Sequence, residues 1–174
     1  MVTTSKGPVR GTTQYVDGKK KVDVFLGIPY AKPPLDNQGF TALARACLEY
    51  NNIMVKELVQ KGAHLETIDN EGRRPIHLAA SVNSYMCLEA LLKGNALKNS
   101  QTSKGKTALF IASENGYIES TQVLLKYDVD PDICDITSKS PLEIAQIRYP
   151  DVGQLIRQYI TGTSPAQNAL KHGM

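Results

Sequence analysis

The sequence predicts a mainly α-helical solenoid of four helix-turn-helix units with β-hairpin fingers, preceded by a short β-rich N-terminal segment. Two sets of positions, each repeating every 33 residues, carry this prediction. One set is typical of tight turns and consists of Gly39, Gly72, Gly105 and Ser138. The other set is entirely alanine and consists of Ala46, Ala79, Ala112 and Ala145. A period near 33 indicates units that are too small to bury their own apolar face and must stack on one another.

Each unit carries the signals of two short helices. A hydroxyl residue that can cap the first helix follows the turn in three units, at Thr41, Thr107 and Ser140. The second unit has Arg74 at this position, so we expect it to lack the cap. Aliphatic residues at helical spacing indicate a second helix. The residues expected to stop these helices in the left-handed conformation are Gly62, Asn95 and Asp128.

The two ends of the chain differ from the units between them. Residues 1–35 alternate valine with threonine and place glycines before and after short runs, which indicates strands joined by tight turns. In the fourth unit, Arg157 and Gln158 occupy slots that hold leucine elsewhere, as a terminal cap requires. Residues 161–174 have little apolar content and are expected to form a flexible tail.

The string D-N-E-G-R-R-P-I-H-L-A-A, which begins at Asp69, resembles the signature of ankyrin repeats. The resemblance extends over residues 36–160 and implies four repeats, at 36–68, 69–101, 102–134 and 135–160. It also implies that proteins of this kind bind partners on a concave groove formed by the finger tips and the first helices. His77 stands at a position where the family has histidine, and we expect it to brace the fold through a hydrogen bond.

The N-terminal string FLGIPYAKPPL, with V-x-T-x-x-G-x-V-R-G before it, resembles the opening of type-B carboxylesterases and cholinesterases over residues 1–35. That family needs a G-x-S-x-G serine elbow, an oxyanion loop and a downstream histidine. The sequence has no G-x-S-x-G and no tryptophan. No catalytic residue can therefore be carried over, and we expect that the chain is not an enzyme and needs no cofactor or metal.

Composition limits the possible partners and compartments. Residues 1–35 carry six Lys/Arg and two Asp/Glu, whereas residues 36–160 carry thirteen and fifteen, so no dense basic face for nucleic acid is expected on the repeats. No apolar run approaches a membrane span, and no signal peptide is visible, which predicts an intracellular, cytoplasmic protein. Cys47, Cys87 and Cys134 lack metal-ligand spacing and are expected to be free thiols that pack as small buried residues. We expect a monomer.

The predicted function is non-catalytic binding of a partner protein or peptide in the groove. Packing does not dictate the residues at the finger tips and helix edges, so they should set specificity. The predicted groove residues are Phe40, Glu49, Asn70, Glu71, Arg73, Val82, Ser103, Lys104, Lys106, Asn115, Lys139 and Arg148. Ile136 and Ile147 also fall at such positions.

One groove position is aromatic in the first unit and basic in the next three. Its residues are Phe40, Arg73, Lys106 and Lys139. This series fits a solvated face, and it also fits a groove for an acidic or partly apolar peptide with Phe40 and Arg73 as anchors. The repeat pattern assigns no packing role to Arg73. Two other interpretations stay open: a carboxylesterase relative without its catalytic residues, and an accidental fusion of two unrelated segments.

Overall fold

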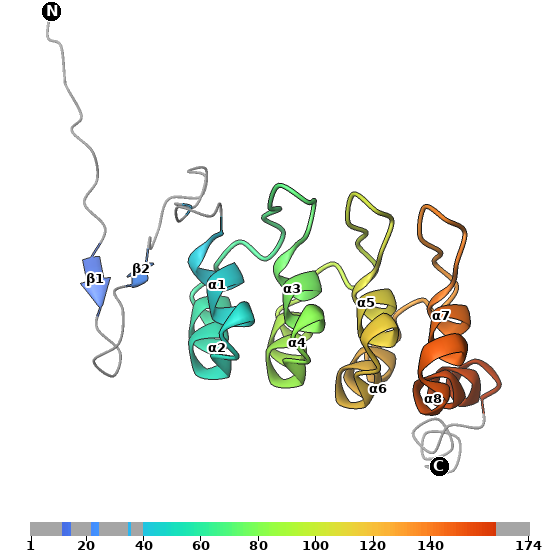
Figure 1. The fold of residues 1–174 in the computed structure, drawn as a ribbon. Coiled ribbons are helices and arrows are strands. Elements are labelled where there is room, and N and C mark those ends of the chain that lie inside the picture. Colours follow the sequence, from blue (N-terminus) through green and yellow to red (C-terminus); the bar gives the residue numbers. More distant parts are fainter. Residues whose placement is uncertain (1–11, 15–21, 25–34, 36–39, 163–174) are drawn as a thin grey trace, which may run out of the picture.

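The computed structural model describes residues 12–14, 22–24, 35 and 40–162, and the statements below concern these residues. Residues 40–162 form eight α-helices that stand as four pairs in chain order (Figure 1). The pairs are α1 (Ala42–Leu48) with α2 (Asn52–Gln60), α3 (Pro75–Ser81) with α4 (Tyr85–Lys93), α5 (Ala108–Asn115) with α6 (Ile118–Lys126), and α7 (Pro141–Arg148) with α8 (Pro150–Ile160). The mainly helical, repeating fold is therefore as predicted.

The helices form two layers along the stack. The inner helices α1, α3, α5 and α7 pack against one another in order, and α2, α4, α6 and α8 form the second layer. The repeated alanines lie in this interface and are 0–5% exposed. Leucines of the second layer, among them Leu88, Leu91 and Leu124, are fully buried. One continuous core thus runs through all four pairs.

The inner helices begin where the capping hydroxyls predict. Thr41 Oγ1 accepts the N–H of Ala44 at 3.1 Å, and Thr107 Oγ1 accepts the N–H of Phe110 at 3.1 Å. Ser140 forms a capping box with Glu143, in which each side chain accepts a backbone N–H of the other. These bonds satisfy donors that a helix start leaves without partners.

The second helices also stop as predicted. Gly62, Asn95 and Asp128 have positive φ angles of 76°, 64° and 52°. A residue in the left-handed conformation thus ends each of α2, α4 and α6, because it turns the backbone away from the helix axis.

Each finger is a five-residue turn. In the finger of residues 69–73, the N–H of Asp69 donates to the Arg73 carbonyl, and the N–H of Gly72 donates to the Asp69 carbonyl, both at 3.0 Å. The same two bonds recur in the fingers of residues 102–106 and 135–139. No β-strand is present within residues 40–162, so these fingers are turns where β-hairpins were predicted. Two bonds across five residues leave no room for a strand ladder.

Neighbouring fingers are joined by backbone hydrogen bonds. The N–H of Ser103 donates to the Glu71 carbonyl, and the N–H of Ile136 donates to the Lys104 carbonyl, both at 3.2 Å. A Cβ added at Gly105 would lie 2.8 Å from the Ile136 nitrogen. Glycine is therefore required here by the approach of the next finger as well as by its φ of +71°. Ser138 has the same left-handed φ in the last described finger, where no further finger approaches.

Two short strands are described near the N-terminus. β1 (Thr12–Gln14) pairs antiparallel with β2 (Val22–Val24), and Thr13 lies opposite Asp23. The rest of the predicted β-rich segment, the turn position Gly39 and most of the predicted tail lie outside the described residues. At the other end, α8 buries Val152 and Ile156 and leaves Arg157 exposed, as expected of an outermost helix.

We expect Thr107→Ala to lower the free energy of unfolding by about 1–2 kcal/mol, because it removes the cap of α5 and leaves the Phe110 N–H without its acceptor. Urea denaturation of the full chain measures the change. Gln122→Ala, on the exposed face of α6, is the control and should shift stability by less than about 0.5 kcal/mol. An equal loss in both variants would contradict the role of the cap.

Candidate functional site

The predicted groove residues lie on the fingers and at the ends of the inner helices. Glu49 and Val82 directly follow α1 and α3, whereas Asn115 and Arg148 are the last residues of α5 and α7. Phe40 precedes α1, and the others belong to the fingers. Four of the twelve are partly buried, namely Phe40, Arg73, Val82 and Lys106, and the other eight are exposed. Because backbone bonds join the fingers, the finger residues share one surface (Figure 1).

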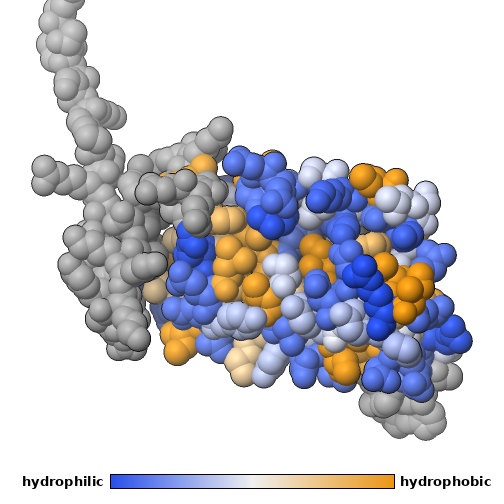
Figure 2. All heavy atoms as spheres, viewed as in Figure 1, coloured by the Kyte–Doolittle hydropathy of each residue, from blue (hydrophilic) through white to orange (hydrophobic). Residues whose placement is uncertain are grey.

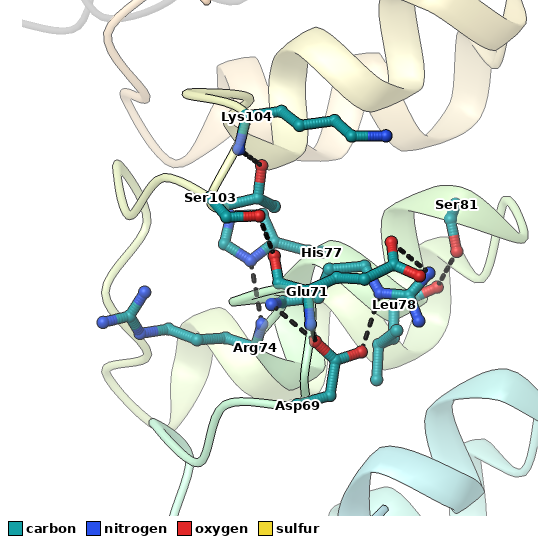
Figure 3. Close-up of polar contacts among 10 residues, drawn as sticks. Asp69, Glu71, Arg74, His77, Leu78, Ser81, Ser103 and Lys104 are labelled. Carbon is teal, nitrogen blue, oxygen red and sulfur yellow. Dashed lines mark hydrogen bonds and ion pairs between the residues drawn. The ribbon is translucent and has the colours of Figure 1, made fainter. Parts of the chain in front are cut away.

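Arg73 is held inside its own finger. Its Nε donates to Asp69 Oδ2 at 2.7 Å, and its Nη1 lies 3.5 Å from Glu71 Oε2. Burial alone would raise the pKa of Asp69, but hydrogen bonds from Arg73 and from the Glu71 N–H outweigh it and lower that pKa. The Asp69 carboxylate at the centre of this network is visible in Figure 3. Arg73, to which the packing pattern assigns no role, therefore has ionic partners within its own finger.

Lys106 and Phe40 also have partners within the chain. Lys106 forms an ion pair with Glu114, and its Nζ lies 5.2 Å from the centre of the Phe110 ring. The Arg45 guanidinium lies over the Phe40 ring at 5.4 Å. Cations close to an aromatic face are attracted by the ring electrons. Three of the four members of the predicted aromatic and basic series are therefore occupied by internal contacts.

The remaining basic residues are different. Lys104, Lys139 and Arg148 are exposed, and none of them has an ion pair with another described residue. Two isoleucines lie among them in the sequence. Ile136 is 72% and Ile147 73% exposed, the highest values among the large hydrophobic side chains that the structure describes. The sequence placed both at groove positions, but it gave no measure of their exposure.

His77 braces the fold as predicted. Its Nδ1 accepts the N–H of Arg74 at 3.0 Å (Figure 3). Its Nε2 lies 2.8 Å from the Ser100 carbonyl. The first bond requires a neutral ring whose Nε2–H donates to Ser100. The imidazole thus binds the backbone at the start of α3, where Arg74 provides no side-chain cap. Burial is the main cause that lowers the pKa of His77 to about 4.

Several residues in the described part of the chain are of types that could bind a metal ion or act as nucleophiles. No group of His, Cys, Asp and Glu among them could hold a metal ion. Burial raises the pKa of the Cys47 and Cys87 thiols, which favours the unreactive protonated form. Cys134 is exposed, so the expectation of burial is wrong for this residue, which precedes a finger as the exposed Gln101 does. No helix in the described part of the chain has the length and apolar character to cross a membrane.

Two protein families match the chain. The model of ankyrin repeats in three copies matches residues 87–169, and the model of the carboxylesterase family matches residues 1–52. The carboxylesterase match reaches past the predicted residue 35 and covers α1, which here is the first inner helix of the stack.

Three relatives illustrate the similarity. Human ankyrin repeat and SOCS box protein 3 is 33% identical over 100 residues, 56% of this chain and 19% of that protein. The Xenopus laevis neurogenic locus notch homolog protein 1 is 36% identical over 113 residues, 64% of this chain and 4% of that protein. The mouse B-cell lymphoma 3 protein homolog is 38% identical over 94 residues, 51% of this chain and 21% of that protein. The chain thus spans about a fifth or less of the length of these relatives.

Stacked helix pairs with linked fingers define a helical repeat protein. More specifically, residues 87–169 match the ankyrin repeat family, and residues 1–52 are similar to the carboxylesterase family. Both resemblances predicted from the sequence are confirmed.

We expect the basic finger residues to differ in their effect on stability. Arg73→Glu places a third carboxylate beside Asp69 and Glu71, and should lower the free energy of unfolding by about 1 kcal/mol. Lys139→Glu, at the equivalent exposed position, should change it by less than about 0.5 kcal/mol. Urea denaturation at low salt measures both. Equal effects would mean that the Arg73 contacts do not stabilise the finger.

A second expectation concerns pH. Between pH 7 and 5 the unfolded chain takes up a proton on His77 while the folded chain does not, so stability falls as the pH falls. A folded pKa of about 4 against an ordinary value of about 6.5 predicts a loss of about 2 kcal/mol over this range. The loss should largely disappear in His77→Gln and persist in His64→Gln, whose histidine is exposed. A pH dependence that survives in His77→Gln would refute the assignment.

Proposed function

We propose that the chain is a non-catalytic module that binds a partner protein or peptide on the surface formed by its fingers and inner-helix ends. The observation that carries the proposal is the backbone bonding between successive fingers. These bonds fix the spacing of exposed side chains that have no packing role, as a recognition surface on a rigid scaffold requires. Residues 36–160 form the binding domain, residues 1–35 a separate segment, and residues 161–174 the tail.

The comparisons support protein binding in general terms. The support is the similarity to human ankyrin repeat and SOCS box protein 3 and the match of the ankyrin repeat model to residues 87–169. Stacked repeats present extended concave surfaces that such proteins use for binding. Three cysteines without disulfides fit the reducing environment of the cytoplasm, where we place the chain as a monomer.

A carboxylesterase-like function is the second candidate, because the family model matches residues 1–52. The sequence lacks the G-x-S-x-G elbow that holds the nucleophile of this fold. Hydrolysis of an aryl ester by the purified full chain would support this candidate. A hydrolysis rate equal to that in buffer alone would contradict it.

Site-specific photo-cross-linking tests the binding surface. A benzophenone amino acid at position 115 lies at the end of α5, whereas the same group at position 122 lies on the exposed outer face of α6. We expect discrete adducts with a partner protein from position 115 and none from position 122, since only the first position lies on the proposed surface. Adducts only from position 122 would move binding to the outer layer and contradict the proposal.

A further inference from the structure

One pair of positions is equivalent in the third and fourth helix pairs but differs in chemistry. Lys106 and Glu114 form an ion pair, and both side chains are about a quarter exposed. The residues 33 positions later are Lys139 and Ile147. The two backbones match, because α5 and α7 start after extended capping residues and both fingers close with the same two hydrogen bonds. The side chains of Lys139 and Ile147 therefore face one surface, and no ion pair joins this lysine to another residue that the structure describes.

A second isoleucine and a second lysine border this surface. The N–H of Ile136 donates to the Lys104 carbonyl, which places the last described finger against the one before it. Figure 2 shows hydrophobic surface at the tip of the finger that precedes α7. Arg148 follows Ile147 at the end of α7 and is exposed. We call these five residues the fourth-pair patch: Lys104, Ile136, Lys139, Ile147 and Arg148.

The acidic residues four positions before and after Lys139 do not form ion pairs with it. Asp135 Oδ1 accepts the N–H groups of Thr137 and Lys139 and the Thr137 hydroxyl. Glu143 Oε2 accepts the N–H and hydroxyl of Ser140 in the capping box. Both carboxylates thus serve the local backbone. The patch thus holds three cations without an ion pair to any described residue, together with two exposed isoleucines.

We propose that the fourth-pair patch is the anchor of the binding surface, and that it takes a peptide segment with acidic side chains next to at least two apolar ones. The proposal rests on the proposed function and specifies its partner. Carboxylates of the partner complete the ion pairs that Lys106 makes internally one unit earlier, and its apolar side chains cover Ile136 and Ile147. Charge complementarity steers such a segment to the patch, and burial of isoleucine supplies affinity. The anchors expected from the sequence, Phe40 and Arg73, already have internal partners.

Peptide selection on the full chain tests the proposal. Random 12-residue phage-displayed peptides are selected on the immobilised protein, and dissociation constants of the fluorescein-labelled winners are measured by polarisation. We expect winners rich in Asp or Glu and in Leu, Ile or Phe. Ile147→Asp and Lys139→Glu should each weaken their binding by about tenfold or more.

Two matched variants serve as controls. Ile53→Asp changes an isoleucine that is 69% exposed near the start of α2, and Lys56→Glu reverses an exposed lysine on the same helix. Both should leave the dissociation constant within about twofold, as expected for residues outside the contact. Circular dichroism of all four variants confirms that they remain folded.

Several results would overturn the proposal. Winners that are basic, or whose binding is unaffected by Ile147→Asp and Lys139→Glu, would do so, as would a selection without winners. A dimer that sedimentation detects and Ile147→Asp dissolves would identify a second copy as the occupant. If a partner still cross-links from position 115 in any of these cases, the proposed function stands and only the patch fails. If position 115 yields no adduct either, both fail.

Discussion

The close approach of the inner helices is the constraint on which the rest of the structure depends. Each inner helix carries a buried alanine at the same position of the repeat, and Ala79, Ala112 and Ala145 are fully buried. A larger residue would separate the pairs, and overpacking of this kind is costly. The same spacing allows one finger to donate a backbone hydrogen bond to the next. The core and the surface are therefore set by a single distance between units.

Features that depend on the local backbone could be predicted from the sequence. The cap of Thr107, the left-handed conformation of Asn95 and the brace of His77 follow from residue type at a fixed position in the repeat. Side-chain pairing could not be predicted in the same way. Arg73 can reach several acids, and its bond to Asp69 depends on how the finger turns. The pattern identified it only as a residue that packing does not require.

The positions of the candidate site stay a prediction, whereas the internal contacts of its expected anchors are visible in the structure. Backbone hydrogen bonds join the fingers, as the repeat register implies, but the register does not show which side chains already have partners within the chain. Lys106 and Lys139 occupy equivalent positions in the repeat, and the residue eight positions later decides whether the lysine has an acidic partner there. Glu114 neutralises the first, whereas Ile147 leaves the second without an acid.

The bonds between fingers also fix a length scale for recognition. Helices that pack side by side lie about 8–10 Å apart. An extended peptide advances about 3.3 Å per residue. An extended segment that ran along the stack would therefore reach the next finger at roughly every third residue. Its contacts with successive fingers would recur at this interval.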